Sequence, residues 1–477
     1  MRRTKIVASL GPASWDEPVL RKLIAAGADV IRINLSHGDP ATQLALVDRV
    51  RRVSRDEGRA VGVLVDLPGP KVRTAPFPDG GDELAAGDTV ELRCGAATSD
   101  HLVIGVDLDD LGVRAGDRIV LGDGAVVLEV VAGPECPGLP ATARVRRGGR
   151  MQGRPGIHLP DGAGGVSGPT ARDLDLAWAA HAAGADAVAA SFVQSAADVQ
   201  RLIDALGPDR PQVVAKIETA SAVEHADAIL AVADAVMIAR GDLGIRLPIE
   251  DVPHVQKRLV RAAIAAGRPV VTATQMLESM IVAASPTRAE VSDVANAVFD
   301  GTDAVMLSAE TAVGADPAEA VAVMAAVVSR AEREADYLQW GGKLGKLRRS
   351  CELTTTAKIT DATSEGAWRA ATNVGAAAIV CCTRTGDTAR AVARFRPTVP
   401  VLAVSQSERT VRELAMTWGV TAVPARPWDT TDDMVWFATE EAIAAGVAGP
   451  GDVLVVIGGY PGEADPAADV LRVVRLR

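Results

Sequence analysis

Two carboxylates and a lysine follow two successive apolar segments in the middle of the chain. The segment VVAKIE ends in Lys216 and Glu218, and the next apolar segment runs into RGDLG, which contains Asp242. Residues two apart in a β-strand point to the same side, so Lys216 and Glu218 would enter one site. Mg2+ is usually held by one or two carboxylates together with waters and substrate oxygens. Glu218 and Asp242 are therefore a candidate Mg2+ site, with Mn2+ as an alternative metal.

Two plainer interpretations of these motifs remain open. A lysine and a glutamate at a strand end also form structural salt bridges, and Gly-Asp-Leu-Gly is also ordinary turn chemistry. The backbone N–H groups of Gly241 and Asp242 would bind a carboxylate if they begin a helical turn. Because the two motifs follow consecutive strands, we favour a metal and anion site over two unrelated structural features.

The motif RINLSHG places three polar side chains on one face of another strand end. These are Arg32, Asn34 and Ser36, and His37 follows them. Arginine suits bidentate contact with phosphate, whereas asparagine and serine oxygens suit a hard cation. Together with Lys216 and the carboxylates, this set suits a small phosphorylated anion. Phosphoryl transfer needs positive charge and in-line positioning more than covalent help.

Composition limits the classes of function that remain. The chain has 477 residues and a formal net charge of −11, and nucleic-acid binding wants a net basic surface. The five cysteines have no zinc-ligand spacing and suggest no disulfide framework. No apolar run has the length of a membrane span, and the N-terminus lacks the apolar core of a signal peptide. We expect a cytoplasmic protein that binds neither nucleic acid nor membranes.

Short apolar segments alternate with helical segments over most of the chain. The predicted strands are 5–10, 29–35, 60–66, 187–193, 213–218, 235–240, 269–274 and 304–308. Helical spacing of apolar residues marks the segments 16–26, 171–183, 250–266 and 318–332. This pattern predicts an α/β fold in which the parallel strands close into a (β/α)8 TIM barrel. An open doubly wound sheet is the alternative, and polar residues at most strand ends favour the barrel, whose active sites lie on that rim.

The pattern changes in two places and so predicts two further domains. From 74 to 156 the chain has short alternating strands with Gly, Asp and Pro turns, which indicates an inserted small β-barrel-like domain that would cover the barrel mouth. The barrel itself would comprise 1–73 and 157–345. Residues 346–477 contain three further buried strands with helices between them and predict a C-terminal α/β domain.

In this order, the motifs resemble the signatures of the pyruvate kinase family. The resemblance rests on KIVASLGPAS, GADVIRINLSHG, DLPGPKVRT, AASFVQSAADV, VVAKIE, ARGDLG, ATQMLESMI, PTRAEVSDVANAVFDG and DAVMLSAETA, and in the C-terminal part on TRTGDTARAVARFRP, TVRELAMTWGV and GDVLVVIGG. It implies phosphoryl transfer from phosphoenolpyruvate to ADP, giving pyruvate and ATP in glycolysis. It also implies a lid domain, a regulatory C-terminal domain and a homotetramer.

The resemblance assigns a role to each candidate residue. It implies that Lys216 neutralises the phosphoryl group and the enolate, that Arg32 grips phosphate, and that Glu218 and Asp242 hold Mg2+. It implies that the amides of Gly241 and Asp242, with Thr274, hold the substrate carboxylate, and that Thr274 with Ser308 relays a proton. It also implies that the nucleotide is bound by Asn34, His37 and Arg73.

The stretch DLPGPKVR carries the family's monovalent-cation site. The matching ligands are Asn34, Ser36, Asp66 and the carbonyl of Leu67. In the family that this chain resembles, the members that require K+ look to have glutamate at the position of Lys71. We expect the tethered ammonium of Lys71 to stand beside Asp66 in place of K+, so that K+ is not required. The alternative is an exposed lysine after a turn.

The chain departs from the family pattern in a few positions. The lysine expected to touch nucleotide phosphate falls at Pro155, so Arg154 is the candidate substitute, although arginine geometry differs from that of lysine. Arg246 stands where an acid is common, and Ala309 stands where glycine is usual. Glycine matters there only if the backbone has a positive φ.

A second ligand site is expected in the C-terminal domain. The resemblance implies that a small phosphorylated effector binds the loop formed by Thr383, Arg384, Thr385, Gly386, Asp387 and Thr388. Asp387 brings a negative charge into this loop, so we expect weak or absent binding of a sugar bisphosphate. Two other functions compete with an active pyruvate kinase: a non-catalytic sensor of phosphoenolpyruvate or nucleotide, and a metal-dependent aldolase built on the same barrel.

Overall fold

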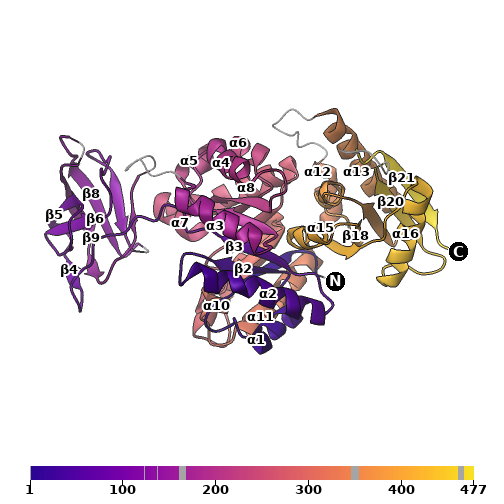
Figure 1. Ribbon diagram of the computed structural model, residues 1–477, viewed down its shortest axis with the longest axis horizontal. Coiled ribbons are helices and arrows are strands. Elements are labelled where there is room, and N and C mark those ends of the chain that lie inside the picture. The colour runs from indigo at the N-terminus through magenta and orange to yellow at the C-terminus, as the bar shows by residue number, and fades with distance from the viewer. Residues whose placement is uncertain (1, 123, 137, 161–167, 345–353, 460–466) are drawn as a thin grey trace.

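The computed structural model describes residues 2–122, 124–136, 138–160, 168–344, 354–459 and 467–477. The chain forms a central barrel with a small β-domain on one side and a C-terminal α/β domain on the other, as Figure 1 shows. Among the described residues, no helix is long and apolar enough to cross a membrane.

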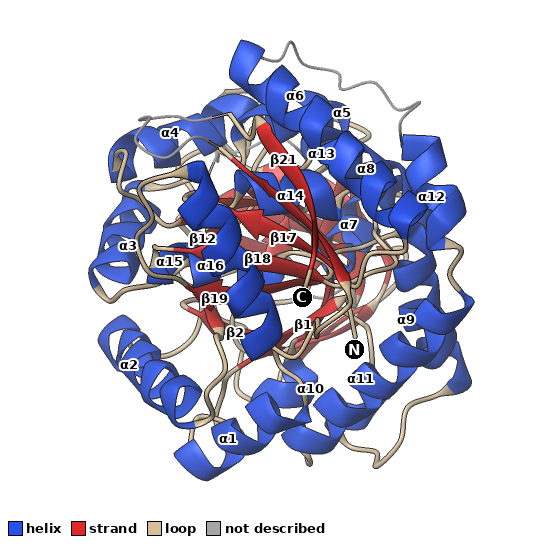
Figure 2. Ribbon diagram, turned by 90° about the vertical axis from the view of Figure 1, so that its right-hand side faces the viewer, coloured by secondary structure: helices blue, strands red, loops and turns tan. Residues whose placement is uncertain are grey.

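Eight described strands, all parallel, close into the central barrel. They are β1 (Lys5–Ser9), β2 (Val30–Asn34), β3 (Gly62–Asp66), β12 (Ala187–Ala190), β13 (Gln212–Ile217), β14 (Ala235–Ala239), β15 (Val270–Ala273) and β16 (Ala304–Leu307). Consecutive strands are joined by helices that surround the barrel in Figure 2. The predicted TIM barrel is confirmed, and the open doubly wound sheet is excluded because β1 pairs with both β2 and β16.

Helices surround the barrel strands, and some of them begin or end at residue types that favour those positions. They are α1 (Glu17–Ala26), α2 (Pro40–Asp56), α3 (Ala171–Ala182), α4 (Ala196–Leu206), α5 (Ala220–Glu224), α6 (Ala226–Val232), α7 (Arg240–Arg246), α8 (Val252–Ala266), α9 (Arg288–Asp300), α10 (Ala309–Ala312) and α11 (Pro317–Glu334), with 3-10 turns η2 (Ile249–Asp251) and η3 (Glu278–Ile281). Thr170 caps α3 through the Asp173 N–H, and Gly267 ends α8 in a left-handed conformation.

Two predicted strands end earlier than their apolar pattern suggests. The segments 187–193 and 269–274 stop as strands at Ala190 and Ala273. The reason is local, since Phe192 has a φ of 56° and Thr274 a φ of 67°, and a left-handed residue cannot continue a β-strand. The residues that follow these two strands therefore lie in turns.

The inserted domain has its own apolar core and two sheets. Its strands are β4 (Asp82–Leu84), β5 (Thr89–Cys94), β6 (Val103–Val106), β7 (Arg118–Leu121), β8 (Val126–Ala132), β9 (Ala141–Arg147), β10 (Gly149–Met151) and β11 (Ile157–His158). The order β11-β7-β8-β9-β5-β6 makes a near-closed small barrel, and β10 pairs with β4. This sheet extends to His158, two residues beyond the predicted boundary at 156, because β11 pairs with β7.

The C-terminal domain is a five-stranded sheet of order β19-β18-β17-β20-β21, in which only β21 is antiparallel to its neighbour. After α12 (Tyr337–Leu344), which precedes this domain, its elements are α13 (Thr355–Val374), β17 (Ala378–Cys382), α14 (Asp387–Ala393), β18 (Val401–Ser405), α15 (Glu408–Glu413), η4 (Leu414–Met416), β19 (Val420–Pro424), α16 (Thr431–Ala444), β20 (Val453–Gly458) and β21 (Val470–Arg475).

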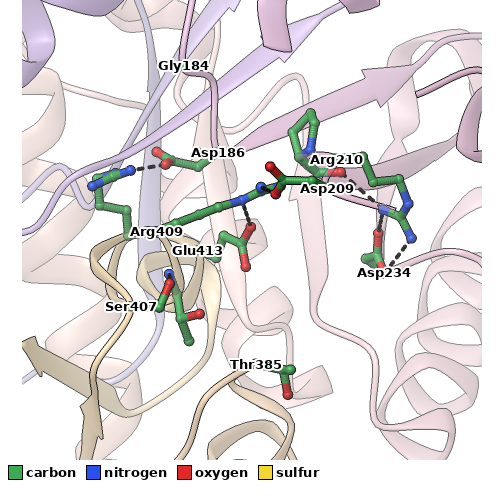
Figure 3. A network of polar contacts seen from close by, with 12 residues as sticks. Gly184, Asp186, Asp209, Arg210, Asp234, Thr385, Ser407, Arg409 and Glu413 are labelled. Carbon is green, nitrogen blue, oxygen red and sulfur yellow. Dashed lines mark hydrogen bonds and ion pairs between the residues drawn. The ribbon is translucent and has the colours of Figure 1, made fainter. Parts of the chain in front are cut away.

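The C-terminal domain closes the floor of the barrel. Ala415 and Met416 of η4 belong to the same buried apolar cluster as the inward-facing side chains of the barrel strands. Around this contact, Arg409 Nη1 lies 2.6 Å from Asp209 Oδ1 of the barrel, and its Nε lies 2.8 Å from Glu413 Oε1 (Figure 3). The C-terminal domain therefore covers one end of the barrel, and the small domain lies toward the other end (Figure 1).

Candidate functional site

Lys216 lies at the centre of the site, near the carboxyl end of β13. Its ammonium nitrogen Nζ lies 2.8 Å from Glu218 Oε1, 3.2 Å from Asp66 Oδ1 and 2.7 Å from Ser191 Oγ. Burial by itself would lower the pKa of Lys216, but the carboxylates of Asp66 and Glu218 raise it above its ordinary value. Lys216 is therefore a fixed positive charge at neutral pH.

Arg32 supplies a second positive charge through the same buried carboxylate. Its Nε and Nη2 each lie 2.7 Å from Asp66 Oδ2, and its Nη1 donates to Ser9 Oγ at 2.9 Å. Asp66 is 1% exposed. Burial would raise the pKa of Asp66, but Lys216 and Arg32 outweigh burial and lower it. Two cations thus share one ionised acid, which fixes the positions of both positive charges at the barrel mouth.

Glu218 and Asp242 provide the carboxylates that suit a divalent metal. Glu218 is 1% exposed, and its Oε2 accepts a hydrogen bond from the Phe192 N–H at 2.8 Å. Burial raises the pKa of Glu218, Lys216 opposes this rise, and the charge of Asp242 adds to it. A divalent cation would remove the repulsion between the two carboxylates, so both residues fit Mg2+.

No larger cluster of metal ligands competes with this pair. Within the described ranges, no group of three or more His, Cys, Asp or Glu side chains is arranged to hold a metal ion. The protein would therefore supply two carboxylates, and the other ligands of the metal would come from water and substrate, as is usual for Mg2+.

A cavity of about 970 Å3 opens between the barrel and the small domain, and its barrel wall contains Gly241, Asp242, Thr274 and Ser308. The Gly241 N–H donates to Thr274 Oγ1 at 2.8 Å. Gly241 and Asp242 lie in the first turn of α7, as the sequence required for an anion site. The hydroxyl of Ser308 is buried and has no hydrogen-bond partner in the described part of the chain, so it can bond to a ligand.

The small domain forms the opposite wall of this cavity through Arg118 and Arg147. Arg118 Nη1 donates to the carbonyl oxygen of Ile245 at 2.6 Å. This bond satisfies a carbonyl near the end of α7, where helix carbonyls lack partners. In the other direction, Arg246 Nη1 donates to the Leu159 carbonyl at 3.3 Å. The small domain therefore contacts the helix that carries Asp242.

Two of the residues assigned to the nucleotide lie at the hinge of the small domain. Arg73 pairs with Gly156 in an isolated bridge, and its Nη1 donates to the Arg154 carbonyl at 3.1 Å. Arg154 Nη2 lies 3.2 Å from Asp107 Oδ2. The structure brings these two arginines together, with the guanidinium of Arg154 engaged within the small domain.

The other proposed nucleotide and cation ligands cluster after β2 and β3. Asn34 Oδ1 accepts the Ser36 N–H at 3.0 Å, and the Leu67 carbonyl accepts the Ser191 hydroxyl at 2.8 Å. Partial burial lowers the pKa of His37, so this imidazole is neutral at pH 7. The Leu67 carbonyl is close to the Lys216 cluster, because Ser191 contacts both.

Lys71 differs from its expected position. Its side chain is exposed and makes no ion pair or hydrogen bond within the described ranges, and the positive charges on Asp66 come from Arg32 and Lys216 instead. Lys71 is nevertheless near the site. Burial lowers the pKa of His37, and the positive charges of Lys71, Arg73 and Arg32 lower it further.

The predicted effector loop lines a separate cavity of about 530 Å3 between the barrel and the C-terminal domain. Thr383 Oγ1 accepts the Gly386 N–H at 2.9 Å. Thr385 Oγ1 donates to Asp387 Oδ2 at 2.7 Å, and Arg390 Nη2 lies 3.3 Å from Asp387 Oδ1. Burial would raise the pKa of Asp387, but Arg390 and the Thr385 hydroxyl lower it, so this carboxylate stays ionised. Thr388 and Arg384 line the same cavity.

Sequence reasoning assigned no role to several side chains that shape the site. Ser191 bridges Lys216 and Leu67, Arg118 reaches α7 from the small domain, and Arg240 lies beneath the cavity. Ser191 and Arg240 do stand at strand ends in the motifs AASFVQS and ARGDLG, which was the available signal. Nothing local marks Arg118. Ala309 has no positive φ, so alanine replaces glycine there without backbone strain.

The rim of this barrel holds two cations around an ionised acid, and a pair of carboxylates lies beside them. With the small domain next to the cavity, these features indicate the class of phosphoryl-transfer enzymes. Residues 1–321 match the family description "Pyruvate kinase, barrel domain", and residues 361–474 match "Pyruvate kinase, alpha/beta domain". The chain belongs to the pyruvate kinase family.

Individual relatives agree with this assignment. The chain is 38% identical over 470 residues to a pyruvate kinase of Sporosarcina psychrophila, covering 97% of this chain and 79% of the relative. It is 36% identical over 480 residues to a pyruvate kinase of Clostridium acetobutylicum, covering 99% of each. It also superposes on the crystal structure of a pyruvate kinase from Cryptosporidium parvum with a TM-score of 0.91 and 30% identity, covering 100% of this chain and 96% of that one.

Proposed function

We propose that this chain transfers the phosphoryl group of phosphoenolpyruvate to ADP, giving pyruvate and ATP, as a glycolytic enzyme of the cytoplasm. The observation that carries the proposal is the charged ammonium of Lys216, held between Asp66 and Glu218 at the barrel mouth. A preorganised positive charge beside a migrating phosphoryl group stabilises the transition state without reorganising during the reaction. The printed names of relatives that span nearly the whole chain support the same reaction.

Lys216 and Arg32 would hold the phosphoryl group. Both side chains are anchored on Asp66, so neither has to give up rotational freedom when the anion binds. Lys216 would also neutralise the enolate oxygen that remains when the bond between phosphorus and that oxygen breaks. The electron pair of this bond goes to the oxygen, and the phosphoryl group passes to the terminal oxygen of ADP.

The first turn of α7 would bind the other end of the substrate. The amide of Asp242, with the amide of Gly241 and the hydroxyl of Thr274, which bond to each other in this structure, would turn to a substrate carboxylate. The enolate carbon then takes a proton, which we assign to a relay through Thr274 and Ser308. The unpartnered buried hydroxyl of Ser308 supports this role, since it needs a ligand or a water as its partner.

Glu218 and Asp242 would hold Mg2+, and Mn2+ would fit the same oxygen ligands. When bound, the metal supplies positive charge to the phosphoryl oxygens. The raised pKa of Glu218, due to burial with Asp242 nearby, supports a cation at this position, because a metal would stabilise both ionised carboxylates.

Nucleotide binding is assigned to Asn34, His37, Arg73 and Arg154. The neutral imidazole of His37 can accept or donate a hydrogen bond without adding charge. Pro155 brings no cation to the phosphates, so we assign those contacts to Arg73 and Arg154, which lie together at the hinge. Arg154 would have to exchange its partner Asp107 for phosphate as the nucleotide binds.

We further propose that the enzyme does not require K+. The supporting observation is that Asp66, one of the expected cation ligands, already pairs with the cations of Arg32 and Lys216, so a further cation would be repelled. By family resemblance we also propose a homotetramer. We propose that the loop from Thr383 to Thr388 binds a small phosphorylated effector, and that it binds a sugar bisphosphate only weakly.

One assay tests the reaction. ATP formation is measured in a coupled assay with phosphoenolpyruvate, ADP and MgCl2, in buffers free of K+. We expect turnover that depends on all three components. Binding of phosphoenolpyruvate without ATP formation would instead identify a non-catalytic sensor, and an aldol product without ADP consumption would identify an aldolase.

A further inference from the structure

One buried arginine lies beside the site without a part in the transfer described above. Arg240 is the first residue of α7 and is 8% exposed. Its Nη1 lies 2.6 Å from Asp293 Oδ2 of α9. Its other terminal nitrogen, Nη2, donates to the carbonyl oxygens of Thr274 at 2.7 Å and Gln275 at 3.1 Å. Arg240 therefore joins a helix of the outer ring to the turn after β15.

The turn that Arg240 holds has an unfavourable backbone conformation. Thr274 has a φ of 67° and Gln275 a φ of 54°, and left-handed backbone is costly for residues with a Cβ. Two such residues in succession persist only where their surroundings enforce them, and such sites cluster where function needs a particular geometry. Here the enforcing contacts are the two bonds from Arg240 and the bond from the Gly241 N–H to Thr274 Oγ1.

The left-handed turn decides where the hydroxyl of Thr274 lies. With an extended backbone the side chain would leave the first turn of α7, whereas in this conformation Thr274 Oγ1 accepts the Gly241 N–H at 2.8 Å. The same hydroxyl donates to the Ala273 carbonyl at 2.6 Å. Its orientation toward the cavity therefore depends on the carbonyls that Arg240 binds.

We propose that Arg240 and Asp293 are positioning residues for phosphoryl transfer: Arg240 holds the left-handed turn of Thr274 and Gln275, and Asp293 holds Arg240. The inference rests on the proposed function, in which Thr274 contacts the substrate. The planar fork of arginine is required, because one terminal nitrogen serves the carboxylate while the other serves two carbonyls. A lysine ammonium would be a point charge without this fixed division.

Helix α9 braces the same loop at a second point. Glu290, one turn before Asp293, accepts the Ser279 N–H at 2.7 Å and the Ser279 hydroxyl at 2.6 Å. Ser279 lies in η3, directly after the Thr274 turn. Helix α9 thus holds the loop at both ends, at Thr274 through Asp293 and Arg240, and at Ser279 through Glu290. A shift of α9 would therefore move Thr274.

The first test measures kcat, KM and thermal unfolding for Asp293→Asn and Arg240→Lys. Misplacing a catalytic group by about 1 Å can cost about 10²-fold, so we expect about that loss of kcat for Arg240→Lys and about tenfold for the milder Asp293→Asn. The unfolding temperature of Asp293→Asn should fall only slightly, since Asp293 is partly exposed and asparagine keeps an oxygen that accepts from Arg240. Asp234→Asn is the matched control, because Asp234 also pairs with an arginine, Arg210, but at the opposite end of the barrel.

A double-mutant cycle separates positioning from general structural damage. If Asp293 acts through Thr274, the variant Asp293→Asn/Thr274→Ala will be no slower than Thr274→Ala alone. If the loss of kcat in the double variant equals the product of the two single losses, the proposal is overturned. A normal kcat for Asp293→Asn would overturn it as well. Should Arg240→Lys fail to fold, the cycle with Asp293→Asn still decides.

A crystal structure of Asp293→Asn provides a readout that does not need activity. We expect Thr274 or Gln275 to leave the left-handed region, or Arg240 to leave their carbonyl oxygens. An unchanged turn would refute the positioning role. If the wild-type chain made no ATP, the proposed reaction would fail, while this structure would still decide whether Asp293 and Arg240 hold the turn.

Discussion

The ammonium of Lys216 lies 2.8 Å from the carboxylate of Glu218, two residues farther along the chain. Both side chains are largely buried at the carboxyl end of β13, on the side of the barrel away from the floor that Met416 closes. The lysine is held in its charged form, whereas burial raises the pKa of the glutamate. In the proposed reaction, this pair would offer a cation to the phosphoryl group and, beside it, a carboxylate to the metal.

Replacing Lys216 by methionine should abolish most turnover while leaving the fold intact. A preorganised charge on the transferring group is typically worth about 10³-fold or more, and methionine fills a similar volume. Coupled ATP formation measures the loss, and circular dichroism checks the fold. Lys257→Met is the control, since Lys257 pairs with Asp300 on the outside of the barrel. Turnover near that of the control would count against the proposed reaction.

Removing one of the two metal carboxylates should weaken Mg2+ binding. We expect Glu218→Gln and Asp242→Asn each to raise the Mg2+ concentration needed for half-maximal activity by at least about tenfold, and EDTA to abolish activity of the unaltered chain. Titration calorimetry with MgCl2 alone measures the same loss without turnover. Equal Mg2+ affinity in all three proteins would contradict the assignment of these ligands.

The charge at position 71 should decide the response to K+. We expect the unaltered chain to be fully active in K+-free buffer, and Lys71→Glu to gain activity on addition of KCl, because a negative charge would replace one of the cations around His37. KCl titrations with NaCl and tetramethylammonium chloride as ionic-strength controls measure this response. Strong activation of the unaltered chain by K+ would refute the prediction.

The contact between Arg118 and Ile245 should hold the small domain over the cavity. A hydrogen bond from a charged group at an exposed site contributes about 1 kcal/mol, or a factor of about five. We expect Arg118→Ala to lower kcat/KM for ADP by about this factor. Arg114→Ala is the control, because Arg114 is an exposed arginine of the same domain that does not line the cavity. Equal losses in both variants would show that the contact has no specific effect.

Asp387 should limit binding of bisphosphates to the C-terminal loop. Its pKa is lowered, since Arg390 and Thr385 outweigh the opposing effect of burial. The carboxylate therefore loses its charge only below the ordinary aspartate value of about 4, and lowering the pH from 8 to about 6 should not improve binding. Asp387→Asn should improve it at both pH values. Micromolar affinity of the unaltered chain for fructose bisphosphate, measured by calorimetry, would disprove the prediction.

Most of the fold and part of the site follow from local sequence. The barrel strands were predictable because apolar segments alternate with helical segments, and strand ends were misjudged where Phe192 and Thr274 adopt left-handed conformations. Apolar side chains such as Val193 continue the pattern past such a turn, so the pattern contains no sign of it. The partners of Asp66 could not be predicted from the sequence pattern either, because Arg32 and Lys216 reach it from two other strands of the closed barrel.

The sequence by itself determined the order of the elements and the pairing of Lys216 with Glu218, because spacing along one strand sets which side chains share a face. Only the tertiary structure decided that Asp66 is shared by Lys216 and Arg32, and that Arg240 reaches both Asp293 and Thr274. Charges and hydrogen bonds act over a few ångströms in space, and closing the barrel is what brings these distant parts of the chain within that range.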